Sequence, residues 1–222
     1  MNREACLELI RKERLVTLAR RIPTEKLVQA LTACADNGIR LFESTFDHTC
    51  ADPIHENAKK LVELKKALGN RICFGAGTVL TAEEVHAAYD AGCEFIISPD
   101  SDPEVIEETR ELGMVSIPGA MTPTEIKRAW KLGADIVKLF PADDLGYHYI
   151  WNLQGPLGHI PLMATGGVNP ATIPEFFAKG ILAVGTGVTI FRPDLIAAED
   201  YEGIGTLAKM HVDVVRLCQR GK

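Results

Sequence analysis

The amino-acid sequence predicts an α/β protein, a (β/α)8 (TIM) barrel with a short N-terminal helix. Short apolar runs of 4 to 6 residues alternate with amphipathic stretches from one end of the chain to the other. Runs of that length are typical of strands buried on both faces, as in parallel sheets. The alternation favours βα units joined by right-handed crossovers. Eight such units in 222 residues match the lower size range of this barrel.

The strands are predicted where Val, Ile, Leu or Phe dominate a short run. These runs are 15–19, 40–45, 72–75, 95–98, 115–118, 136–140, 161–165 and 182–185. Because periodicity alone does not show that a sheet closes, a doubly wound open sheet remains the structural alternative.

The helices are predicted where a capping residue opens a stretch and a glycine ends it. Five stretches have this form: 24–38, 81–92, 102–113, 122–133 and 169–180. In the second of them, Thr81 and Glu84 form a capping-box pattern. Residues 1–13 are expected to form an extra helix that covers the bottom of the barrel. No linker interrupts the series, so residues 1–222 are interpreted as one barrel domain.

Composition excludes several classes of protein. The net charge of −6 and the pI of about 5.6 do not suit binding to nucleic acid phosphates. No apolar run approaches the roughly 18 residues of a membrane helix, and the N-terminus has no apolar core typical of a signal peptide. The six cysteines show no CxxC spacing and are interpreted as reduced thiols. We expect a cytoplasmic protein without a membrane partner.

Two charged residues stand inside predicted strands. Lys138 lies within 136–140, and Glu43 lies late in 40–45. A buried lysine is costly unless it is paired, so one interpretation is a structural ion pair with a carboxylate. The other is a lysine that forms a Schiff base, because a site of low polarity lowers the pKa and exposes the nucleophilic neutral amine. Glu43 would then be the acid and base that moves protons.

Glycines follow three of the predicted strands, in Gly75-Ala76-Gly77-Thr78, Thr165-Gly166-Gly167 and Gly185-Thr186-Gly187. In barrels, glycines after strands 7 and 8 bind phosphate through backbone N–H groups. Structural turns are the alternative. Arg20 ends the first strand, where an arginine can hold a carboxylate through two hydrogen bonds or be a surface charge.

The six histidines form no HxH or HExxH pair. Asp47 and His48 follow Glu43 closely, and together they would suit a metal-dependent aldolase. We favour a site without a metal.

Five stretches together resemble the class I 2-keto-3-deoxy-6-phosphogluconate (KDPG) / 4-hydroxy-2-oxoglutarate (KHG) aldolase family, in the order and spacing of that family. The resemblance runs from about residue 7 to 217. The stretches are Phe42-Glu43-Ser44-Thr45, Gly75-Ala76-Gly77-Thr78-Val79, Phe95-Ile96-Ile97-Ser98-Pro99, Val137-Lys138-Leu139-Phe140-Pro141-Ala142 and Thr165-Gly166-Gly167-Val168.

The resemblance implies a homotrimeric barrel that needs neither metal nor cofactor and acts on a small keto acid. Lys138 would form the Schiff base with pyruvate, and Glu43 would move protons. The other residues that the family pattern assigns to substrate binding are Arg20 and Thr78 at the carboxylate, Pro99 and Phe140 in the pocket wall, Thr165 at the substrate, and Gly166, Gly167 and Gly187 at the phosphate.

The chain departs from the family pattern at two positions. Asp47 stands where many members have an arginine, and Val188 stands where members often have a serine after Gly-x-Gly. Asp143 and Asp144 also add two acids near the expected phosphate. These departures leave open whether the natural substrate is phosphorylated.

The sequence favours a lyase that splits a 2-keto-3-deoxy (phospho)sugar acid, or 4-hydroxy-2-oxoglutarate, into pyruvate and an aldehyde. One alternative is a phospho-sugar isomerase or epimerase on the same barrel, which would leave Lys138 unexplained. The other is a barrel that binds sugar acids without catalysis, which has no need of a buried amine.

Overall fold

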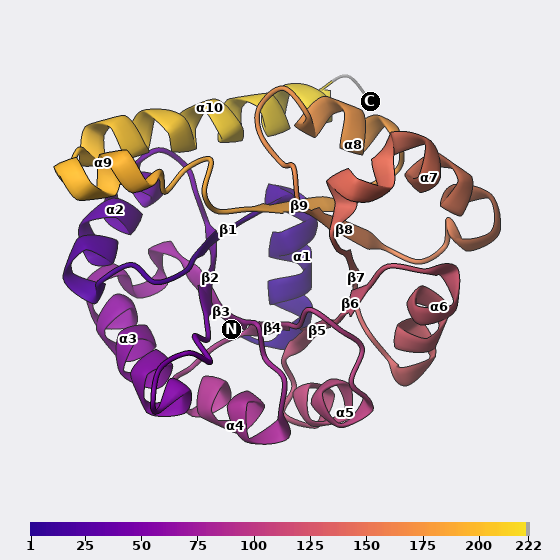
Figure 1. Cartoon of the computed structure of the whole chain (residues 1–222), viewed down its shortest axis with the longest axis horizontal. Coiled ribbons are helices and arrows are strands. Elements are labelled where there is room, and N and C mark those ends of the chain that lie inside the picture. The colour runs from indigo at the N-terminus through magenta and orange to yellow at the C-terminus, as the bar shows by residue number, and fades with distance from the viewer. Residues whose placement is uncertain (221–222) are drawn as a thin grey trace.

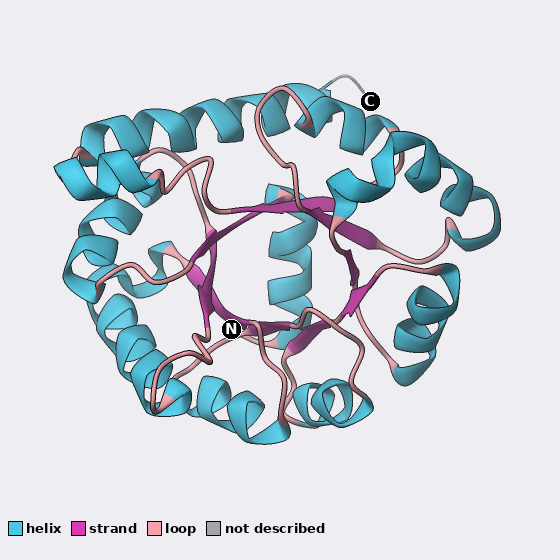
Figure 2. Ribbon diagram, in the orientation of Figure 1, coloured by secondary structure: helices cyan, strands magenta, loops and turns pink. Residues whose placement is uncertain are grey.

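The protein is an α/β barrel, with parallel strands in the middle and helices around them (Figure 1, Figure 2). The computed structural model describes residues 1–220. The strands are β1 Leu15–Ala19, β2 Leu41–Thr45, β3 Cys73–Gly77, β4 Phe95–Ile97, β5 Val115–Ile117, β6 Gly119–Ala120, β7 Val137–Leu139, β8 Leu162–Thr165 and β9 Ala183–Thr186. Their order in the sheet is β5-β4-β3-β2-β1-β9-β8-β7-β6, and every pairing is parallel. The predicted barrel is therefore confirmed.

The barrel closes at its fifth strand, which Pro118 divides into β5 and β6. β5 pairs with β4 on one side, and β6 pairs with β7 on the other. Two further bonds join the edges of the sheet, because Asp135 N–H donates to the carbonyl of Ser116 at 2.9 Å and Lys138 N–H donates to that of Pro118 at 2.8 Å. These bonds complete the ring and rule out the open-sheet alternative.

The helices surround the barrel and follow the strands in the chain (Figure 1). They are α1 Arg3–Glu13, α2 Thr24–Asp36, α3 Pro53–Leu68, α4 Ala82–Asp90, α5 Pro103–Glu111, α6 Pro123–Leu132, α7 Ala142–Leu157, α8 Ile173–Ala178, α9 Pro193–Ala198 and α10 Tyr201–Arg220, with a 3-10 turn at Gly69–Arg71. Within residues 1–220, no helix is both long and apolar enough to cross a membrane.

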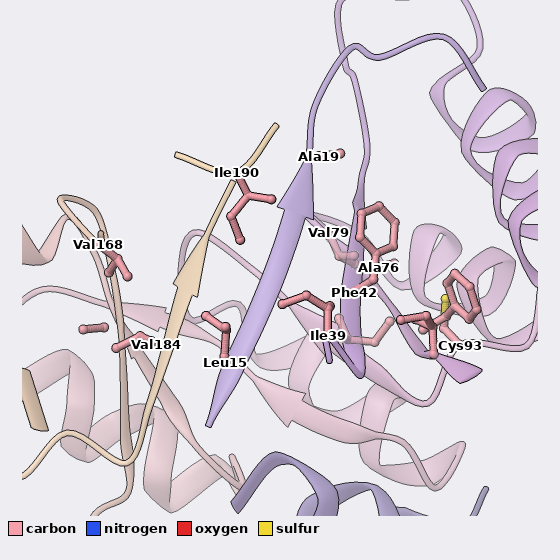
Figure 3. Packing of buried hydrophobic residues seen from close by; sticks show 14 of the residues in the cluster. Leu15, Ala19, Ile39, Phe42, Ala76, Val79, Cys93, Val168, Val184 and Ile190 are labelled. Atoms are coloured by element: carbon pink, nitrogen blue, oxygen red, sulfur yellow. The ribbon is translucent and has the colours of Figure 1, made fainter. Parts of the chain in front are cut away.

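Alternation along the strands creates two separate hydrophobic cores. The outer core lies between the strands and the helices and includes Phe42 and Val184, which Figure 3 shows among their neighbours. The inner core fills the lower half of the barrel with residues such as Val16, Leu41 and Met163. Because one face of each strand is buried in the inner core and the other in the outer core, the strands are continuous apolar runs in the sequence.

Helix α1 closes the bottom of the barrel, as its sequence position predicts. Its buried residues Cys6, Leu7 and Ile10 join the inner core, and Figure 1 shows the helix through the opening of the ring. Arg3 forms an ion pair with Asp135, which also accepts a hydrogen bond from the N–H of Ser116 at 3.0 Å. The helix is thus fixed to the strands by apolar packing and by this ion pair.

One predicted capping pattern and one predicted helix start differ from what the structure shows. The Thr81–Glu84 capping box is half formed: Thr81 accepts from the N–H of Glu84, but the Glu84 carboxylate accepts from Leu80 instead of Thr81. The helix expected at residue 169 begins at Ile173, because the Asn169 side chain accepts the N–H of Ala171 at 2.9 Å and makes a turn first.

Candidate active site

The predicted site residues on the strands point into the barrel because they share the alternation of the inner core. Glu43 lies two residues after Leu41, Lys138 two after Ile136, and Thr165 two after Met163, all three of which belong to that core. Side chains two apart on a strand share a face. Glu43 and Lys138 therefore occupy a layer directly above the apolar plug that ends at α1.

The amine of Lys138 is enclosed but has no ionic partner. The residue is 7% exposed, and Nζ lies 4.7 Å from the centre of the Phe140 ring. Among the described residues, it has no salt-bridge oxygen within 4.0 Å, and no fully buried side-chain nitrogen or oxygen lacks a partner. Lys138 is therefore not locked in a structural ion pair.

Glu43 lies beside the neighbouring strand β3, which leaves room for its side chain. The residue is 4% exposed, and its Oε1 accepts a hydrogen bond from the Thr45 hydroxyl at 3.3 Å. Gly77 on the neighbouring strand leaves the space that the carboxylate fills, because a Cβ there would overlap Oε1. The glycine is thus a requirement of the Glu43 position.

Burial shifts the two groups in opposite directions. Desolvation lowers the pKa of Lys138, and the nearby Arg20 adds to this, while the charge of Glu43 opposes it. Desolvation likewise raises the pKa of Glu43, against the charges of Lys138 and Arg20 and the Thr45 hydrogen bond. Each group is thereby brought closer to a neutral form that can exchange a proton.

Arg20 and Thr78 come together at the mouth of the barrel. Arg20 Nη2 donates to the Thr78 hydroxyl at 3.0 Å, although 58 residues separate them in the sequence. Thr78 has a left-handed backbone, with φ of 57°. A guanidinium and a hydroxyl side by side present donors that suit a carboxylate.

A cavity of about 740 Å³ opens at the carboxyl ends of the strands. It is lined by six of the predicted residues, Arg20, Phe140, Thr165, Gly166, Gly167 and Gly187. Pro99 lies elsewhere, in an adjoining hollow of about 380 Å³. Phe140 borders both spaces, so it forms the wall between them.

The glycines at the cavity allow close approaches. A side chain on Gly187 would meet the carbonyl and side chain of Leu18, and one on Gly185 would meet the Thr165 hydroxyl. Gly166 and Gly167 both have positive φ, and Asp143 packs against this turn. Of the two acids that the sequence brings near the turn, the structure places Asp143 in contact with it.

At the rim of the barrel, Asp47 forms an ion pair with an arginine. Asp47 accepts from Arg21 Nε at 3.0 Å and Nη2 at 3.2 Å, so the two form a bidentate pair. Hydrogen bonds from the Thr49 side chain and backbone, together with Arg21, lower the pKa of Asp47 to about 2. The pair joins the β1–α2 loop to the β2–α3 loop.

His48 is directed to Glu84, not to Glu43. Its Nε2 lies 2.6 Å from Glu84 Oε1, and its ring stacks on Phe46. Across residues 1–220, no three His, Cys, Asp or Glu side chains gather in a way that could hold a metal ion. The Asp47–His48 metal hypothesis therefore has no third ligand in this region.

The family model for the KDPG and KHG aldolases matches residues 7–207. The chain belongs to the KDPG and KHG aldolase family. It is 32% identical to the 2-dehydro-3-deoxy-phosphogluconate aldolase of Treponema pallidum, over 94% of this chain and 95% of that protein. It is 30% identical to the KHG/KDPG aldolase of Escherichia coli, over 87% and 88%.

A solved structure described as native KDPGal shares the fold of this aldolase. It has a TM-score of 0.82 and 28% identity, and the match covers 93% of this chain and 96% of that one. The prediction of an aldolase, and hence of a lyase, is confirmed.

Sequence reasoning missed the residues that hold the site of the aldolase in place. Thr45 and Gly77 position Glu43, and Arg21 pairs with Asp47. Gly75 and Gly77 point to the same face of the sheet as Glu43, and that shared alternation is the signal that was available in the sequence. The Arg21–Asp47 pair depends on loop geometry, for which the sequence carries no periodic pattern.

Proposed function

We propose that this aldolase is a class I enzyme that cleaves a 2-keto-4-hydroxy acid through an imine on Lys138. The products are pyruvate and an aldehyde. The substrate belongs to the 2-keto-3-deoxy (phospho)sugar acids or is 4-hydroxy-2-oxoglutarate. The observation that carries the proposal is the enclosed, unpaired amine of Lys138, with its lowered pKa and with Glu43 in the same layer. A neutral amine is the nucleophile that attacks a ketone.

In the proposed mechanism, Lys138 Nζ attacks C2 of the keto acid, and loss of water leaves a protonated imine. Glu43 then takes the proton of the 4-hydroxyl group. The C3–C4 bond breaks, its electron pair moves towards the imine nitrogen, and the aldehyde leaves. The resulting enamine is protonated at C3, and water hydrolyses the imine to release pyruvate. Glu43 would supply and remove these protons.

The remaining proposed roles concern binding and orientation. Arg20 and Thr78, which hydrogen-bond each other, would hold the carboxylate of the pyruvate half. Pro99 and Phe140 would wall this half, and Thr165 would contact the substrate from β8. The other proposed binding residues are the glycines at the far end, Gly166, Gly167 and Gly187.

Borohydride trapping with pyruvate tests the mechanism. Reduction converts the imine into a stable secondary amine, so peptide mapping should find one pyruvate adduct, at Lys138. Lys26 is the matched control, because it lines the same cavity but pairs with Glu199 at 3.1 Å. Lys26→Ala should keep the adduct, and Lys138→Ala should lose it. An adduct at another lysine, or none in the wild type, contradicts the proposal.

We also propose that the aldolase works as a homotrimer in the cytoplasm and requires no cofactor. Sedimentation equilibrium at several protein concentrations measures the assembly, and a mass of one or two chains would contradict the trimer.

A further inference from the structure

Helix α10 carries a buried histidine on a face that is otherwise apolar. His211 is 1% exposed, and the buried residues beside it on the same helix include Ala208, Val212 and Val215. A polar ring in such a place is costly unless its nitrogens are hydrogen-bonded. The partners of the two nitrogens therefore explain how a histidine is kept at this position.

The two ring nitrogens of His211 have different partners, which fix the position of the ring hydrogen. Nδ1 lies 2.8 Å from the carbonyl oxygen of Leu207. Because a carbonyl can only accept, Nδ1 carries the hydrogen. Burial lowers the pKa of His211 more than the Leu207 hydrogen bond raises it, which favours the neutral ring. Nε2 is then an acceptor, and the Thr189 hydroxyl at 3.1 Å donates to it.

Thr189 connects this histidine to both glycine turns of the active-site cavity. Its hydroxyl oxygen lies 2.7 Å from that of Thr186 and 3.3 Å from the carbonyl of Val168. Thr186 donates to the same carbonyl at 2.9 Å. Val168 directly follows the glycine turn after β8, while the two threonines flank Gly187 after β9. These three residues thus join the two turns to each other, and His211 joins them to α10.

The acceptor at Nε2 decides where the hydrogen of the Thr189 hydroxyl goes. A hydroxyl has one hydrogen to donate. With His211 present, Thr189 donates to the ring, and the Val168 carbonyl is left to Thr186. With an apolar side chain in place of the ring, Thr189 would donate to the Val168 carbonyl or to Thr186 instead. The hydrogen bonds at both turns would therefore rearrange.

We propose that His211 is a positioning residue, which holds the two glycine turns in a fixed arrangement by accepting the hydrogen bond of Thr189. In the proposed function, these turns bind the half of the substrate that leaves as the aldehyde. His211 is not among the residues that line the cavity, so it acts on this half through Thr189 and not by contact. The inference rests on the proposed function and adds a residue that controls binding of the far end of the substrate.

The test measures aldol addition of pyruvate to two aldehydes, the reverse of the proposed cleavage. Glyceraldehyde 3-phosphate extends well beyond its reacting carbonyl, whereas glyoxylate has only two carbons. His211→Leu keeps the approximate size of the side chain and removes the acceptor. KM for glyceraldehyde 3-phosphate should rise roughly 3- to 10-fold, the value of one hydrogen bond, while KM for glyoxylate and both kcat values stay within about two-fold.

Two further variants on α10 distinguish positioning from general packing. His211→Gln can place an amide oxygen near the position of Nε2, so it should restore most of the affinity for glyceraldehyde 3-phosphate. Val215 is also buried and lies one turn further along the same face of the helix. Val215→Ala loosens the packing and leaves the hydrogen bonds of His211 in place. It should therefore keep the wild-type ratio of the two KM values.

Thr189→Val removes the same hydrogen bond from the other side, and it provides the test if His211→Leu does not fold. The KM ratio should change in the same direction as in His211→Leu. Thr189 lines the cavity, so its replacement also removes any direct contact with the aldehyde. In the double variant, His211→Leu should add no further change, because its partner is already absent.

A separate readout distinguishes this inference from the mechanism on which it rests. Exchange of the pyruvate methyl protons in D2O, without any aldehyde, reports enamine formation alone, and it should be equal in the wild type and in all variants. Absence of exchange in the wild type overturns the proposed function and this inference with it. If exchange is normal, four results overturn the inference only: unchanged KM values, equal rises for both aldehydes, the same effect in Val215→Ala, or a wild type that does not use glyceraldehyde 3-phosphate.

Discussion

At the scale of single residues, Lys138 and Glu43 lie in one layer of the barrel, but they do not form a contact ion pair. A contact ion pair would fix the amine as an ammonium, which cannot attack a carbonyl. Here the burial of each group works against its charged form, and their mutual attraction only moderates the effect. Burial therefore disfavours the charged form of both side chains.

Replacing Glu43 separates proton transfer from binding. Glu43→Gln keeps the size of the side chain, so pyruvate affinity should change little. Turnover should fall by about 10²–10⁴-fold, the usual contribution of a positioned acid or base. Steady-state kinetics and pyruvate titration measure the two effects. Near-normal kcat would show that Glu43 is only the structural neighbour of Lys138.

The pH dependence of imine formation should carry the signature of the same pair. The neutral amine reacts, so the borohydride trapping rate should rise with pH, with a midpoint below that of an ordinary lysine because burial lowers the pKa of Lys138. The Glu43 charge stabilises the ammonium. In Glu43→Gln the midpoint should therefore move further down. An upward or absent shift would mean that the two side chains do not interact.

Turnover should survive exhaustive chelation, because in the proposed mechanism the protonated imine would provide the electron sink that a bound metal provides in other aldolases. The measurement is activity after dialysis against EDTA. Loss of activity that a divalent cation restores would redirect attention to Asp47 and His48.

At the scale of elements, β3 makes room for the Glu43 carboxylate because Gly77 has no side chain. Gly77→Ala would drive a Cβ into the Glu43 carboxylate, and displacement of a catalytic group by about 1 Å typically costs 10²-fold in rate. We expect that loss in kcat, with circular dichroism close to wild type. Gly155→Ala, on α7 with open space around it, should keep its activity. Equal behaviour of the two variants would contradict this role of Gly77.

The elements were largely predictable from the sequence, and the exceptions have physical causes. The apolar runs locate the strands well, since each is buried on both faces. Pro118 splits the fifth strand into β5 and β6, a break that an apolar run cannot reveal. Within α7, Gly146 adopts a non-helical backbone that kinks the helix, and no side chain caps its start at Pro141. Side-chain turns, as at Asn169, move a helix start by several residues.

At the scale of the whole molecule, α1 stabilises the barrel from below. Ile10 is fully buried in the inner core, and Ile10→Ala should lower the free energy of unfolding by about 2–5 kcal/mol. Arg11→Ala on the exposed face of the same helix should have little effect. Urea denaturation measures both. Similar values for the two variants would show that the helix is not part of the cooperative core.

The site as a whole was predictable in its membership but not in its arrangement. The family resemblance supplied the residues, and most of them meet at one end of the barrel. The partnership of Arg20 with Thr78 and the separate hollow of Pro99 depend on distances between loops. The alternation that aligns Glu43, Lys138 and Thr165 is present in the sequence. The closure that turns this alignment into an enclosed chamber is a property of the fold.

Helix α1 closes the bottom of the barrel, so in the proposed mechanism both reactants would enter from the carboxyl ends of the strands. Pyruvate attached to Lys138 would sit at the closed end, below the space that leads out past Phe140. In the proposed mechanism, the aldehyde would leave in cleavage while pyruvate is still attached, and in synthesis pyruvate would enter before the aldehyde. An aldehyde that arrives first would block the passage, so an excess of acceptor should inhibit synthesis in competition with pyruvate.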